Sequence, residues 1–175
     1  MSQPNRTFIK MVRIFDAIGE LGGKLAAWLI LPLVAGLTYE VIARYAFRAP
    51  TIWAFDIAYM LYGSLFMLGT GYCLLHKGHI RCDFFYAKLT PQKQGLVDAI
   101  CYLSVFFPGM IFFLIVGWDS AYYSWVIREV SEASPWRPPI YPFKMVIPVS
   151  AFLLILQGVS EALKSLWAVR HGEWL

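Results

Sequence analysis

Four long apolar stretches dominate the sequence of this 175-residue chain. They cover residues 25–43, 57–75, 99–118 and 145–169. Each is close to the roughly 20 apolar residues that an α-helix needs to cross the hydrocarbon core of a bilayer. Hydrophobic residues make up 59% of the chain and charged residues 15%, whereas a soluble domain holds about 45–50% and about 25%. The sequence therefore predicts an all-α integral membrane protein with four transmembrane helices.

Prolines mark where these helices start, bend and stop. Thr90 followed by Pro91 is typical of a helix start, with threonine as the N-cap and proline at the first helical position. The proline-rich connector 134–148 cannot form one continuous helix. Pro32 and Pro108 lie inside apolar stretches, where they predict local kinks.

The lysines and arginines predict the orientation of the chain in the membrane. Ten of the fifteen lie in the N-terminal segment, in the second connector and near the C-terminal end, and five lie in the first and third connectors. Because basic residues accumulate on the cytoplasmic side, both ends are predicted to be cytoplasmic (N-in/C-in). We therefore expect a cytoplasmic N-terminal segment (1–24), a membrane domain (25–169) and a cytoplasmic tail (170–175). The same topology accounts for the net charge of +4 without a nucleic-acid partner.

The N-terminal segment has the pattern of an amphipathic helix. One face at helical spacing is apolar and carries Phe8, Met11, Val12, Phe15 and Ile18. The opposite face is charged and carries Arg6, Lys10, Arg13, Asp16 and Glu20. Such a helix before a membrane span indicates an interfacial helix on anionic lipid. The alternative is a helix that packs on a partner protein.

Charged residues are costly inside membrane helices, so each one needs a physical reason. Glu40 and Arg44 are four residues apart on one helix and can form an ion pair. The short connector before Asp56 brings this carboxylate close to Arg44 in an antiparallel hairpin. We expect a structural ion pair that holds the hairpin, and the alternative is a proton or ion site. Small residues that permit close helix approach lie along the second span: Gly63, Gly69 and Gly71.

The chain offers few residues that could hold a cofactor or perform catalysis. His76 and His79 lie three residues apart in one segment, and no long helix supplies a facing histidine at mid-depth for haem. By residue type, these histidines with Cys82 and Asp83 could hold a metal ion, but we favour the alternative of a polar loop cap. The sequence has no glycine-rich phosphate loop, nucleophile elbow or pair of catalytic carboxylates. We expect neither a cofactor nor an enzymatic activity.

Several short motifs occur in an order that resembles one transporter family. The first span ends in Glu40–Phe47, the second opens with Thr51–Asp56, and Leu68–Tyr72 leads to Lys77–Asp83. A further similar segment covers residues 132–148, with Ser134, Pro142, Lys144 and Pro148. From about residue 13 to residue 164 the chain resembles the small membrane subunit of tripartite ATP-independent periplasmic (TRAP) transporters. Two departures from the family pattern are Asp56, where glutamate is more usual, and Cys82, where valine is more usual.

The resemblance implies a scaffold role in the bacterial inner membrane. It implies a stable complex with a large permease subunit, which carries an organic acid inward on a sodium or proton gradient. It also implies transient contact with a periplasmic substrate-binding protein, and no substrate or sodium ligand in this chain. The expected structural or interface residues are Glu40, Arg44, Trp53, Asp56, Gly69, His79, Asp83 and Lys144. The other functions considered are a membrane anchor subunit of a respiratory redox complex and a small dimeric exporter.

Overall fold

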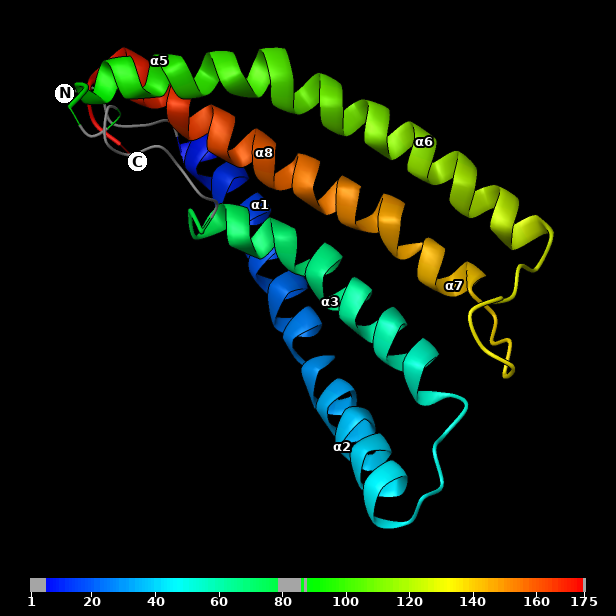
Figure 1. Ribbon diagram of the computed structural model, residues 1–175. Coiled ribbons are helices and arrows are strands. Elements are labelled where there is room, and N and C mark those ends of the chain that lie inside the picture. Colours follow the sequence, from blue (N-terminus) through cyan, green and yellow to red (C-terminus); the bar gives the residue numbers. More distant parts are fainter. Residues whose placement is uncertain (1–5, 79–85, 87, 175) are drawn as a thin grey trace.

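The computed structural model describes residues 6–78, 86 and 88–174, which form helices and loops with no strand among them (Figure 1). The first half contains α1 (Arg6–Ala27), α2 (Ile30–Ala46) and α3 (Ala54–Leu75). The second half contains α5 (Pro91–Cys101), a π-helical turn (Tyr102–Phe106), α6 (Phe107–Val126), α7 (Tyr141–Lys144) and α8 (Val146–His171). Thr90 precedes α5 in an extended conformation with Pro91 next, as predicted, although the threonine hydroxyl makes no capping hydrogen bond.

Four helical stretches are long and apolar enough to cross a membrane, which confirms the predicted fold class. They are Phe8–Ala46, Ala54–Leu75, Pro91–Val126 and Tyr141–His171. Three of them extend well beyond the apolar stretches of the sequence. Polar and aromatic residues continue these helices past their hydrophobic centres, because a helix satisfies its own backbone hydrogen bonds whatever its side chains.

The helix α8 lies at the centre of the bundle, between α3 on one side and the long helix of α5 and α6 on the other (Figure 1). It also packs against α1, whereas α2 packs mainly on α3. The buried residues of α8 are mostly small, and they include Ser150, Ala151, Gly158, Ser165 and Ala168. Small side chains let neighbouring helix backbones approach closely, so α8 can contact helices on several sides at once.

Pro32 and Pro108 each follow an irregular turn. Pro32 has no N–H with which to bond the carbonyl of Trp28, four residues earlier. The N–H of Leu31 bonds that carbonyl instead, at 3.3 Å, and the chain breaks into α1 and α2 at this point. Pro108 follows the π-helical turn, in which the N–H of Phe107 bonds the carbonyl of Tyr102, five residues earlier. A π-turn of this kind accommodates the missing donor of a proline.

The amphipathic helix α1 packs on α3 and α8 rather than standing apart from the bundle. Its buried residues are spaced by seven along the helix: Val12, Gly19 and Ala26. A second apolar stripe stays exposed: Met11, Ile14, Ile18, Leu21 and Leu25. The expected apolar face is thus divided between the protein and its surroundings. Contact of the exposed stripe with anionic lipid stays a prediction.

The start of α1 and the end of α8 lie side by side. The rings of Phe8 and Trp167 have centroids 5.6 Å apart, so these two segments occupy the same end of the bundle, named here the terminal end (Figure 1). The connectors 47–53 and 127–140 lie at the opposite end, named here the loop end. The helix α8 closes with Gly172 in the left-handed conformation (φ 75°), and its N–H bonds the carbonyl of Ala168.

Candidate functional site

At the loop end, Glu40 joins the end of α2 to the connector before α3. Its carboxylate accepts hydrogen bonds from Arg44 Nε at 2.8 Å and Arg44 Nη2 at 2.5 Å. It also accepts bonds from the Thr51 backbone N–H at 2.9 Å and from the Thr51 hydroxyl. The Glu40 side chain is 13% exposed and that of Arg44 is 55% exposed. Glu40 is therefore the inner member of this contact, and Arg44 covers it from outside.

Asp56 does not pair with Arg44, which corrects the expectation from the sequence. Asp56 is 2% exposed at the start of α3, and it accepts hydrogen bonds from Ser131 Oγ at 2.7 Å and from Ser134 Oγ. The connector after α6 folds over the start of α3 and brings these hydroxyls to the carboxylate. Arg44 is already held by Glu40 on its own helix, so the two acidic groups have separate partners.

Lys144 and Trp53, both expected to be structural, lie in contacts at the same end. Lys144 Nζ bonds Glu129 Oε2 at 2.5 Å, which ties α7 to the start of the connector 127–140. This hydrogen bond from Lys144 holds the pKa of the Glu129 carboxyl below its ordinary value. The Trp53 ring stacks on Tyr39 with centroids 5.7 Å apart. The loop end is thus closed by contacts between α2, α3, α7 and the two connectors.

Near the terminal end, a polar cluster joins α1 to α8. Asp16 of α1 accepts hydrogen bonds from Gln157 at 3.0 Å, Ser160 at 2.6 Å and Lys164 at 3.0 Å. Lys164 also bonds Glu161 at 2.7 Å, so one ammonium lies between two carboxylates. The sequence placed Asp16 on a charged outer face of its helix, but the structure turns it toward α8. The signal that could have found this cluster is the polar spacing of residues 157, 160, 161 and 164 on one face of a membrane helix.

Gln157 has one polar atom without a hydrogen-bond partner in the described part of the chain, the buried Oε1. That oxygen lies against Gly19, where an added Cβ would be only 2.5 Å away. The two helices therefore pack closely at this point, as small residues at a helix interface allow. The absent side chain at Gly19 therefore lets α1 approach α8 closely enough for the polar cluster to form.

The structure describes only some of the other residues that the sequence singled out. His79 and Asp83, with Cys82, lie outside the described residues. A Cβ added at Gly69 would meet no atom within 4 Å, so this glycine makes no close contact with another helix of the described residues. A Cβ at Gly63 would lie 2.7 Å from the Phe143 ring. Within residues 6–78, 86 and 88–174, no group of three or more His, Cys, Asp or Glu residues is placed to hold a metal ion.

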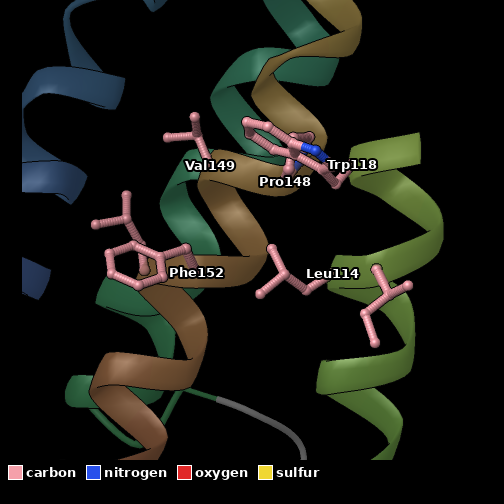
Figure 2. Close-up of a pocket in the computed structure, with 7 residues that line it drawn as sticks. Leu114, Trp118, Pro148, Val149 and Phe152 are labelled. Carbon is pink, nitrogen blue, oxygen red and sulfur yellow. The ribbon is translucent and has the colours of Figure 1, made fainter. Parts of the chain in front are cut away.

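A cavity of about 510 Å³ lies between α6 and α8 (Figure 2). Its lining consists of Leu114, Ile115, Trp118, Pro148, Val149, Phe152 and Leu153. The Trp118 indole N–H is the only polar side-chain atom in this set. The cavity can therefore hold an apolar group, but its side chains offer no cation for a carboxylate.

One charged residue of α6 was missed because the third apolar stretch ends at Trp118. The helix continues to Val126, so Asp119 lies inside it, exposed at the surface. The signal in the sequence was the aromatic run Tyr122, Tyr123 and Trp125, which continues the helical pattern after the aspartate.

The structure thus contains four membrane-length helices, and ion pairs join helices to each other and to the connectors. These features define a multi-pass membrane protein. Residues 33–168 match the family model described as "Tripartite ATP-independent periplasmic transporters, DctQ component". This match covers well over half of the chain, which therefore belongs to the DctQ family and is a small membrane subunit of a TRAP transporter. No curated protein matches the chain.

Proposed function

We propose that this chain is the scaffold subunit of a secondary active TRAP transporter in a bacterial inner membrane. In this role it holds and supports the large permease subunit, which imports an organic acid on an ion gradient. A periplasmic binding protein delivers the acid and contacts the complex transiently. The substrate class and the gradient come from the family resemblance described above.

The observation that carries the scaffold role is how the polar groups are used. Glu40, Asp56, Glu129, Asp16 and Glu161 each bond a side chain from another turn, connector or helix. Interactions of this kind fix the positions of helices and loops. A carboxylate used for ion coupling would instead lie inside the bundle, in a polar site at mid-membrane that an ion could enter.

The predicted orientation agrees with the arrangement of the bundle. Positive-inside counting places both ends of the chain in the cytoplasm, and the contact of Phe8 with Trp167 puts the start of α1 and the end of α8 at one end. In this proposal the terminal end faces the cytoplasm. The loop end, with Glu40, Arg44 and Trp53, then faces the periplasm.

Affinity purification tests the proposal directly. The chain would be tagged in its native host, extracted in mild detergent, and its stoichiometric partners identified by mass spectrometry. We expect one strongly hydrophobic partner, several times larger and without a cofactor. A flavin- or iron–sulfur-bearing partner would contradict the scaffold role in favour of a redox anchor. Isolation without a partner, together with transport by the chain alone in liposomes, would indicate an exporter.

A further inference from the structure

Asp119 is an ionisable residue on the outward face of a membrane helix. It lies seven residues before the end of α6 at Val126, which corresponds to about 10 Å along the helix axis. The last two turns of α6 carry Tyr122, Tyr123 and Trp125, and such rings favour the membrane–water boundary. Asp119 therefore lies on the bilayer side of this aromatic group.

The helix geometry shows that Asp119 points away from the rest of the bundle. The buried residues of α6 are Gly117, Ala121 and Ser124, and Gly117 packs against Ile147 of α8. Each residue advances about 100° around a helix, so Asp119 is nearly opposite both Gly117 and Ala121. Asp119 is exposed and has no hydrogen bond or ion pair within the part of the chain that the structure describes.

The surroundings of Asp119 on α6 are apolar and equally exposed. The neighbours on this face are Phe112, Ile115, Val116, Tyr122 and Tyr123. An aspartate among lipid tails is strongly unfavourable, and membrane proteins nearly always turn such residues toward a partner group or water. Within the described residues no side chain pairs with this carboxylate, so a partner group from outside the described bundle would satisfy it.

The cavity between α6 and α8 opens beside the same face. Ile115 and Trp118 line that cavity. On the helix, Ile115 lies four residues before Asp119 and Trp118 lies directly before it. The surface thus combines a carboxylate with a carbon-lined hollow of about 510 Å³. A helix that places a basic side chain opposite Asp119 and a bulky apolar side chain in the hollow would match both features.

We propose that this face of α6 docks a transmembrane helix of the large permease subunit, and that a lysine or arginine of that helix pairs with Asp119. The inference rests on the proposed function, since it assigns the surface through which the scaffold holds its partner. Another exposed stripe, on α3, carries Phe55, Tyr59, Tyr62 and Phe66. That stripe has no charged residue, so it offers no equivalent reason for a partner to bind there.

Photo-crosslinking in native membranes tests which face is covered. Phe112 on α6 is 69% exposed and Phe66 on α3 is 59% exposed, so each position has room for p-benzoylphenylalanine and its additional benzoyl group. The large subunit is expected to form a strong adduct with the Phe112 variant. With the Phe66 variant it is expected to form at most a weak one. The crosslinked peptide is expected to come from a transmembrane helix that contains a lysine or arginine. Equal adducts from both positions, or a Phe112 adduct with lipid alone, would overturn the assignment.

Charge variants test the ion pair, with co-purified large subunit as the measurement. Asp119→Lys is expected to reduce recovery of the large subunit by about tenfold or more, because like charges would face each other in the membrane. Asp119→Glu keeps the charge and is expected to stay within about twofold of wild type. An unchanged elution profile of the isolated Asp119→Lys chain shows that it still folds. If that variant recovers as much large subunit as wild type, the pairing is wrong while the scaffold role stands. If the wild-type chain recovers no large subunit, the proposed function itself fails.

Discussion

Ser131 donates a hydrogen bond to Asp56 at 2.7 Å across 75 residues of sequence. With the bond from Ser134, it attaches the connector after α6 to the start of α3. Asp56→Leu removes the shared acceptor and leaves a buried hydroxyl at Ser131 without its partner. We expect the free energy of unfolding to fall by about 2–4 kcal/mol, since hydrogen bonds to charged groups contribute about 1.5–3 kcal/mol each. Thermal unfolding in detergent measures the change. Asp56→Asn keeps one acceptor oxygen, so its free energy of unfolding should fall less. An equal fall for both variants would contradict this account.

Glu40 and Arg44 are expected to differ in their importance, although they form one ion pair. Glu40→Ala removes bonds to both Arg44 and Thr51, whereas Arg44→Leu removes only an exposed partner. We expect Glu40→Ala to lower the free energy of unfolding more than Arg44→Leu does, because it removes two contacts and Arg44→Leu removes one exposed ion pair. Chemical denaturation of the two variants in detergent tests this order. A larger loss for Arg44→Leu would show that Arg44 has a further partner.

Lys164 is expected to be the most sensitive ionisable residue of the terminal end. It lies 2.9 Å from Asp16 and 2.7 Å from Glu161, so Lys164→Met leaves two carboxylates without their shared cation. Removing one partner of a buried ion pair typically costs about 3–5 kcal/mol. The matched control is Lys24→Met, which breaks the exposed pair with Glu20 on α1 and should destabilise the chain much less, because exposed ion pairs contribute little. Comparable unfolding temperatures for the two variants would refute a structural role for the cluster.

The surroundings of two glycines predict that their substitution by alanine changes the free energy of unfolding in opposite directions. A Cβ at Gly95 would lie 2.6 Å from the backbone carbonyl oxygen of Ser165, so Gly95→Ala must push α5 away from α8. We expect a loss of about 1–3 kcal/mol in the free energy of unfolding. Gly69→Ala meets no atom within 4 Å and should gain up to about 1 kcal/mol from helix propensity. Both variants can be measured in the isolated chain. A destabilising Gly69→Ala would contradict the open surface at that position.

The contact of Glu129 with Lys144 predicts that the stability of the folded chain depends on pH. The bond from Lys144 holds the pKa of Glu129 below its ordinary value of 4.5. A carboxyl group with a lowered pKa stabilises the folded state fully above its unfolded-state pKa and loses that contribution as the pH falls through its folded-state pKa. Wild type should therefore be more stable than Glu129→Gln at pH 7, and the difference should shrink only below about pH 4.5. Unfolding temperatures of both proteins between pH 7 and pH 3 measure this, and a constant difference would exclude titration of Glu129 as the cause.

The sequence by itself determined the class of fold and the sites of helix irregularity. Apolar stretches of membrane length specify spanning helices because the bilayer leaves the backbone few other ways to satisfy its hydrogen bonds. Pro32 and Pro108 predicted the irregular turns because a missing N–H has its effect within one turn of the helix. The motifs around Arg44, Trp53 and Lys144 indicated the family. All of these signals are local, so a single sequence contains them.

Only the tertiary structure decided which polar groups meet. Proximity in the hairpin pointed Asp56 toward Arg44, but a connector more than 70 residues away supplied its serines. Asp16 was expected on an exposed face and lies against α8, because the close contact at Gly19 sets the rotation of α1. Asp119 fell outside the predicted span because aromatic residues carry α6 two turns further. Helix rotation, helix ends and the path of a loop depend on packing between distant segments, and the pattern of one segment does not specify them.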